Sequence, residues 1–137
     1  MWNQRSDSYE YRYIGQFWKY LQQNKEAMQG CIIAGDFNSN KIWDIKPRKC
    51  NHSDVVRELE EMSIKSLYHQ FFNSSQGEER HPTLYLQRNK LKGYHIDYIF
   101  AHDKFANNMA LFEIGDMETW LKISDHLPVF VEFRFVN

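Results

Sequence analysis

The chain has 137 residues, of which 42% are hydrophobic and 16% aromatic, and this composition predicts one globular domain rather than a disordered chain. The formal net charge of −1 excludes a protein that holds nucleic acid mainly through bulk positive charge, so a phosphate-bearing partner must be held locally by a site or a metal. Its two cysteines form no cluster with metal-ligand spacing, and we expect a reducing compartment. No apolar run approaches the roughly 20 residues that span a bilayer, and the polar first residues lack the apolar core of an export signal, so we expect a cytoplasmic protein.

The first half of the chain predicts a helix, a buried strand and a second helix. Apolar residues recur at helical spacing within residues 8–29, and Gly30 ends this pattern. The short apolar run at residues 31–34 is typical of a buried strand. Ser53 can cap a further helix. The apolar side of that helix consists of Val55, Val56, Leu59 and Met62.

The second half predicts mainly strands. Residues 83–86 and 94–101 have strand character, and the polar, glycine-containing stretch 87–93 joins them as a hairpin. Residues 109–114 form a further candidate strand, and residues 128–136 alternate in the way of a terminal strand. A helix, a strand, a helix and then several strands predict an α/β fold with a mixed sheet.

Three polar segments lie at the ends or starts of the predicted strands. Gly-Asp-Phe-Asn at 35–38 follows a buried strand, at the edge where open α/β sheets place their ligands. In the segment Tyr-His-Ile-Asp-Tyr-Ile-Phe, Asp97 lies on an otherwise apolar strand, and burial of its carboxylate requires a partner. Ser-Asp-His-Leu-Pro at 124–128 leads into the terminal strand. Taken singly, each segment also fits an ordinary turn or a structural carboxylate.

Together, and in this order, the three motifs resemble the second half of the endonuclease/exonuclease/phosphatase family. This family includes deoxyribonuclease I, exonuclease III, abasic endonucleases, inositol-phosphate phosphatases and sphingomyelinases. The resemblance implies the C-terminal half of a four-layer α/β sandwich of the deoxyribonuclease I-like fold, with a mixed sheet and outer helices. Residues 1–137 would then form one partial domain. The alternative is an unrelated α/β domain that carries these motifs by coincidence.

The resemblance also implies a magnesium-dependent hydrolysis of a phosphodiester or phosphomonoester, with Mn²⁺ as an alternative to Mg²⁺. Asp36 matches the carboxylate that activates or orients the attacking water and serves as a metal ligand, and Asn38 matches the residue that positions this water and the phosphate. Asp125 matches a carboxylate near the metal. His126 matches the imidazole that contacts the scissile phosphate, and Asp97 matches the carboxylate that fixes its tautomer and favours its charged form. Magnesium prefers oxygen ligands, which suits these carboxylates.

The first half of the family fold, with its early asparagine and its principal magnesium-binding glutamate, has no counterpart in the sequence. We therefore expect the isolated chain to bind magnesium weakly and to associate with itself or with a missing N-terminal half. An inactive remnant or binding module of the same fold is the alternative function. The substrate stays open between nucleic acid and a small phosphorylated molecule, because substrate choice depends on loops.

Overall fold

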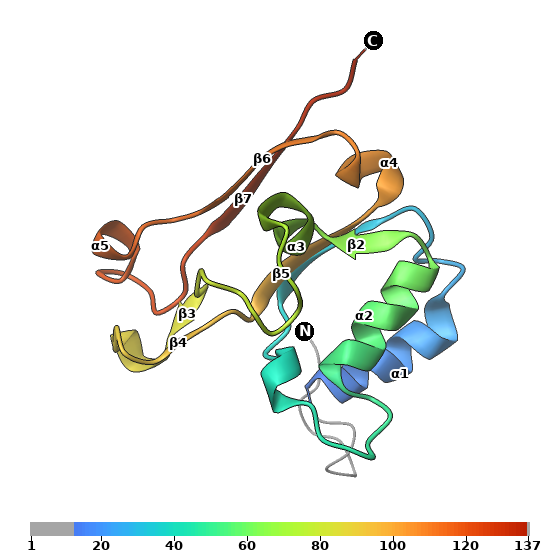
Figure 1. The fold of residues 1–137 in the computed structure, drawn as a ribbon, viewed down its shortest axis with the longest axis horizontal. Helices are drawn as coiled ribbons and strands as arrows, with labels where there is room; N and C mark the ends of the chain where they lie inside the picture. The colour runs from blue at the N-terminus through green and yellow to red at the C-terminus, as the bar shows by residue number, and fades with distance from the viewer. Residues whose placement is uncertain (1–12, 137) are drawn as a thin grey trace.

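Two helices lie side by side against one face of the central sheet in the computed structural model, which describes residues 13–136 (Figure 1). Helix α1 comprises Ile14–Asn24 and helix α2 comprises His52–Glu61. Both turn the predicted apolar faces inward, with Leu21 and Leu59 fully buried. The predicted start of the first helix at residue 8 lies outside the described residues, and residues 25–30 form turns instead of continuing the helix.

The start of α2 corrects the prediction that Ser53 caps this helix. The N-cap is Asn51, whose backbone N–H donates to the Asp54 carboxylate over 2.9 Å. The carboxylate of Asp44 also accepts from the backbone N–H groups of His52 and Ser53. These oxygens satisfy N–H groups of the first turn, which have no partner within the helix, so Ser53 lies inside the helix rather than at its cap.

The central sheet has the strand order β1-β5-β2, formed by β1 (Ile32–Asp36), β5 (Asp97–His102) and β2 (Ile64–Ser66). Strand β5 pairs with both neighbours in an antiparallel manner. The α/β class is confirmed, but every described strand pairing is antiparallel, whereas we expected a mixed sheet. The alternation of apolar residues predicts a strand without its direction, because both kinds of sheet place alternate side chains on opposite faces.

Two hairpins complete the strands. The predicted hairpin is confirmed as β3 (Leu84–Tyr85) paired with β4 (Gly93–Tyr94), and β6 (Met109–Ile114) pairs with β7 (Val129–Phe133) in the long hairpin of Figure 1. In β7 the residues alternate between half-buried and exposed, as predicted.

The prediction of one continuous strand at residues 94–101 is wrong, because the structure divides this stretch between two strands. Residues His95 and Ile96 separate β4 from β5, so the two parts belong to different sheets. The hydroxyl of Thr83 accepts from the backbone N–H groups of both Ile96 and Asp97, over 3.1 and 3.0 Å. These bonds hold the chain where it leaves one sheet for the other, so His95 and Asp97 do not share the face of one continuous strand.

Short helices fill the connections, and the sequence patterns did not predict them. They are α3 (Leu67–Phe72), α4 (Asp103–Ala106), α5 (Met117–Trp120) and the 3₁₀ turns η2 (Lys41–Trp43) and η3 (Leu86–Arg88). No helix in the described part of the chain is long and apolar enough to cross a membrane.

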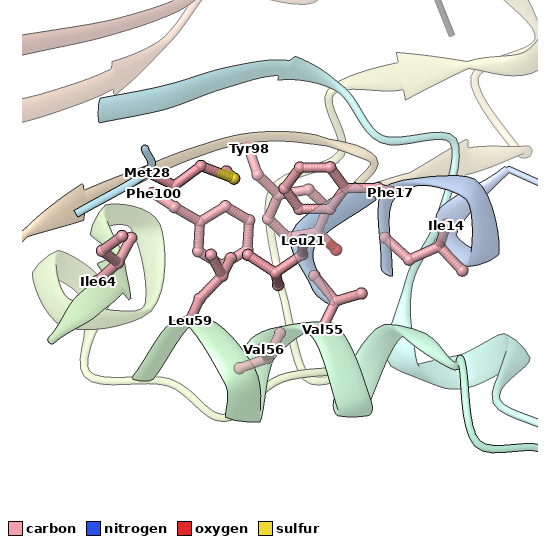
Figure 2. Close-up of a cluster of buried hydrophobic side chains, with 10 residues drawn as sticks. All are labelled: Ile14, Phe17, Leu21, Met28, Val55, Val56, Leu59, Ile64, Tyr98 and Phe100. Atoms are coloured by element: carbon pink, nitrogen blue, oxygen red, sulfur yellow. The ribbon is translucent and has the colours of Figure 1, made fainter. Parts of the chain in front are cut away.

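The core consists of two clusters on opposite faces of β5. Figure 2 shows the first, in which Tyr98 and Phe100 of β5 meet the apolar faces of α1 and α2. The second contains Ala101 and Tyr68 and packs beneath the β6–β7 hairpin. Alternate residues of β5 therefore point into different clusters. Because both faces of β5 are buried, packing fixes the position of this strand, which begins with Asp97.

Candidate functional site

Two of the predicted acidic residues meet at one end of the central sheet. Asp36 is the last residue of β1 and Asp97 is the first residue of β5, and the two are register partners in the antiparallel ladder. Residues directly opposite each other in such a ladder lie close together. The sheet itself therefore brings the two carboxylates together, although they are far apart in the sequence.

The third group, His126, reaches the same place from the chain segment that lies along β3. It forms an isolated antiparallel bridge with Leu84. On either side of it, the carbonyl of Asp125 accepts from the Tyr85 N–H over 2.8 Å, and the Leu127 N–H donates to the Thr83 carbonyl over 2.7 Å. These bonds fix the backbone of His126 beside the hairpin.

The side chains of Asp36, Asp97 and His126 converge. The Nδ1 atom of His126 lies 3.0 Å from one Asp97 carboxylate oxygen and 3.2 Å from the other, and its Nε2 atom lies 4.0 Å from Oδ2 of Asp36. One donor atom from each of the three groups lies within 4.8 Å of the others. Their side chains are 44%, 18% and 36% exposed, respectively, so a ligand can reach them from solvent.

The surrounding charges favour the imidazolium form of His126. Partial burial alone would lower the pKa of the imidazole. The hydrogen bond and charge of Asp97, together with the charges of Asp36 and Asp125, outweigh this effect and raise the pKa of His126 above its ordinary value. The arrangement therefore favours a positive charge on the imidazole at a solvent-accessible position.

The two other predicted residues lie next to this cluster in different ways. Asn38 has a positive φ of 45°, and its backbone N–H donates to Oδ1 of Asp36 over 2.7 Å, which orients that carboxylate. Asp125 adjoins His126 in the chain, but its carboxylate is not part of the three-group cluster found among the described residues. The structure thus brings Asp36, Asp97 and His126 together, with Asn38 on the loop that leaves Asp36.

Two residues that hold this arrangement were missed by the sequence analysis. Thr83 is fully buried and its hydroxyl fixes the backbone of Asp97, while Asn40 is buried and its amide reaches the carbonyl of His95 over 2.9 Å. Neither has a local signal in the sequence, because each acts through a partner that is remote in the chain.

A hollow of about 710 Å³ lies among the residues that follow Asp36. Asn38, Asn40, Trp43 and Asn51 contribute to its lining, whereas Asp36, Asp97 and His126 do not. Asn38, whose backbone N–H donates to Asp36, is therefore the residue that the hollow shares with the loop leaving the cluster.

The carboxylates of the cluster, rather than its imidazole, suit a hard divalent cation. The described cluster contains no thiolate, and the charged form of His126 that its surroundings favour has no free ring nitrogen to bind a metal. Both oxygens of Asp97 lie within 3.2 Å of His126, so Oδ2 of Asp36 is the better-placed oxygen for a metal ion.

No family model matches the sequence, and no curated protein matches it. Solved structures do match the fold. An AP endonuclease from Archaeoglobus fulgidus superimposes with a TM-score of 0.64 and 24% sequence identity, over 95% of this chain and 56% of the other. A 3′-5′ exonuclease from Neisseria meningitidis superimposes with a TM-score of 0.62 and 22% identity, over 94% of this chain and 56% of the other. The chain spans about half the length of these structures, and over that length it has the deoxyribonuclease I-like fold that its motifs predicted.

Proposed function

We propose that residues 1–137 are one partial domain of a metal-dependent phosphoesterase that hydrolyses a phosphodiester or phosphomonoester. The observation that carries this proposal is the convergence of Asp36, Asp97 and His126 at one end of the central sheet. Because the two structural neighbours are an AP endonuclease and a 3′-5′ exonuclease, DNA is the first substrate to test, followed by small phosphorylated molecules.

The role of His126 is to present positive charge to the oxygens of the scissile phosphate. The Nδ1–H group of the imidazole donates to the Asp97 carboxylate, which leaves Nε2 on the side of Asp36. A charged donor that is already oriented lowers the energy of a transition state in which phosphate oxygens gain charge. Asp97 acts through His126 by holding its orientation and favouring its charged form.

The role of Asp36 is to accept a proton from the attacking water or to orient that water. The Asn38 N–H holds Oδ1 of Asp36, while Oδ2 faces the imidazole at 4.0 Å. The side-chain amide of Asn38 is proposed to position the water and the phosphate. Asp36 and Asp125 are the proposed ligands of Mg²⁺ or Mn²⁺, and the ion would neutralise charge on the phosphate oxygens.

Metal binding by the isolated chain should be weak. Two exposed or half-exposed carboxylates leave most of the coordination of magnesium to water, which supports only low affinity. Isothermal titration calorimetry should therefore give a millimolar or weaker dissociation constant for Mg²⁺, with Asp36→Asn weakening it further. Tight, stoichiometric binding would show that another residue supplies the missing ligand.

The test of function is hydrolysis by the chain combined with the N-terminal half of its parent protein, in Mg²⁺ and in chelator. Substitution of His126→Ala should lower the rate by about 100- to 1,000-fold, the usual effect of removing one transition-state charge donor. Lys122→Ala, on an exposed turn of the same segment, serves as the matched control and should retain the rate. A fully active His126→Ala protein would refute the assigned role.

A second candidate is a binding module of the same fold without activity. The observation in its favour is that the chain spans only 56% of the length of each neighbour. Strand β1 also forms an edge of the described central sheet, and most of its residues are exposed, so we propose that a second copy or the N-terminal half covers it. Substrate binding without turnover in the combined protein would favour the binding module.

A further inference from the structure

A closed ring of polar side chains lies beneath the loop that follows Asn38. Ser39 and Asn40 are both buried, and both side chains enter this ring. From Ser39 the ring runs to His52 over 3.2 Å, to Gln76 over 3.0 Å, to His69 over 3.2 Å, to Glu79 over 2.9 Å and to Asn40 over 3.1 Å.

The chemistry of the donors and acceptors fixes the direction of each hydrogen bond in this ring. The Gln76 amide oxygen can only accept, so Nε2 of His52 carries a proton, and Nδ1 of the neutral ring accepts from the Ser39 hydroxyl. The Gln76 amide nitrogen can only donate, so Nδ1 of His69 accepts and its Nε2 donates to Glu79. Asn40 donates to the other oxygen of Glu79. The Glu79 carboxylate is therefore the final acceptor of both arms.

Through Asn40 the ring also contacts the chain segment around Asp97. The Asn40 amide nitrogen lies 2.9 Å from the carbonyl of His95 and 3.1 Å from the hydroxyl of Tyr98. Nearby, the backbone N–H of Phe37 donates to the Ile96 carbonyl over 2.9 Å. One buried network thus ties the loop after Asp36 to the residues that immediately precede Asp97.

We propose that Glu79 is a positioning residue of the site: by accepting from both His69 and Asn40, it fixes the loop of Asp36 and Asn38 relative to Asp97. This proposal rests on the proposed function, in which those residues act on a phosphate ester. Glu79 does not touch the site itself, and its side chain is only 3% exposed. A carboxylate is needed at this position because a glutamine would direct its amide hydrogens at one of the two donors.

The experiment compares Glu79→Gln with the unsubstituted chain by ¹⁵N–¹H nuclear magnetic resonance, with and without Mn²⁺. We expect the amide signals of Phe37, Asn38 and Asp97 to move in the variant. We also expect Mn²⁺ affinity, measured from paramagnetic broadening at these amides, to fall by about tenfold, which is typical for removal of a group that orients a metal ligand. Glu118→Gln, at an exposed glutamate paired with Lys90, is the control and should change neither quantity.

A conservative variant separates positioning from general loss of packing. Glu79→Asp keeps a carboxylate that can accept from His69 and Asn40 and leaves the Asn40 amide in place, so it should restore part of the amide shifts and of the Mn²⁺ affinity relative to Glu79→Gln. Unchanged amide signals and Mn²⁺ affinity in folded Glu79→Gln would overturn the proposal. If that variant does not fold, Gln76→Ala breaks the ring at a half-buried link, and the same two readouts decide the question. If the unsubstituted chain shows no Mn²⁺ broadening, the metal site of the proposed function fails, while the amide shifts still test the positioning role.

Discussion

Buried Glu79 should make the stability of the chain depend on pH well below neutrality. Burial alone would raise the pKa of this carboxyl, but hydrogen bonds from His69, Asn40 and the backbone outweigh it and lower the pKa from 4.5 to about 2. At about 1.4 kcal/mol for each pH unit, this difference corresponds to roughly 3 kcal/mol of unfolding free energy. Because the folded pKa is the lower one, the contribution is complete above pH 4.5 and is lost as the pH falls towards 2.

The assay is urea unfolding of the chain and of Glu79→Gln between pH 7 and pH 3. Glutamine resembles the protonated carboxyl, so the stability advantage of the unsubstituted chain should shrink by about 2 kcal/mol over this range, most of it below pH 5. Glu118→Gln, whose side chain is 78% exposed, should follow the unsubstituted chain throughout. A difference between Glu79→Gln and the unsubstituted chain that stays constant with pH would refute the reasoning.

Three further predictions test the electrostatics of His126, the dependence of stability on pH, and the core. Asp97→Asn should lower the pKa of His126 in a nuclear magnetic resonance titration, because the carboxylate that favours the imidazolium form is removed; an unchanged pKa would contradict the assigned pair. Since the folded pKa of His126 is raised, its contribution to stability is present at low pH and should disappear as the pH rises through that pKa. Leu59→Ala, in the first core cluster, should cost about 2–5 kcal/mol in chemical denaturation, whereas Leu91→Ala, at a 93% exposed side chain, should cost almost nothing; equal losses would show that the cluster is not the main core.

The sequence patterns predicted the parts of the fold that depend on local periodicity. The faces of α1 and α2 follow from apolar residues at helical spacing, and both Leu21 and Leu59 are fully buried. The interruption at His95 and Ile96 could not be predicted, because alternation continues through it. The break depends on hydrogen bonds to Thr83, which is remote in the sequence.

In the candidate site, too, the residues with a local motif were predicted, whereas a residue that depends on remote partners was not. The motifs at strand ends and their family order predicted that five residues would converge: Asp36, Asn38, Asp97, Asp125 and His126. The side chains of Asp36, Asp97 and His126 do so, whereas the carboxylate of Asp125 is not part of the cluster among the described residues. Glu79 lies in a polar stretch without apolar periodicity, where a glutamate normally indicates an exposed loop. Its burial depends on Asn40 and His69 reaching it from other elements, and a single sequence does not encode such pairs locally.

Because His126 is attached to the β3–β4 hairpin, the candidate site has two parts that differ in local stability. Asp36 and Asp97 belong to the central sheet, whose middle strand is buried on both faces, whereas the backbone of His126 is bonded to a hairpin with only two residues in each strand. Two-stranded hairpins this short open more often than sheets that are buried on both faces. Each opening of β3 from its neighbours would withdraw the imidazole from Asp97 while the two carboxylates stayed together. The time that the three groups spend assembled therefore depends on the opening of this short hairpin, and a ligand that bridges His126 and Asp36 would slow hydrogen exchange in β3 and β4 more than in β5.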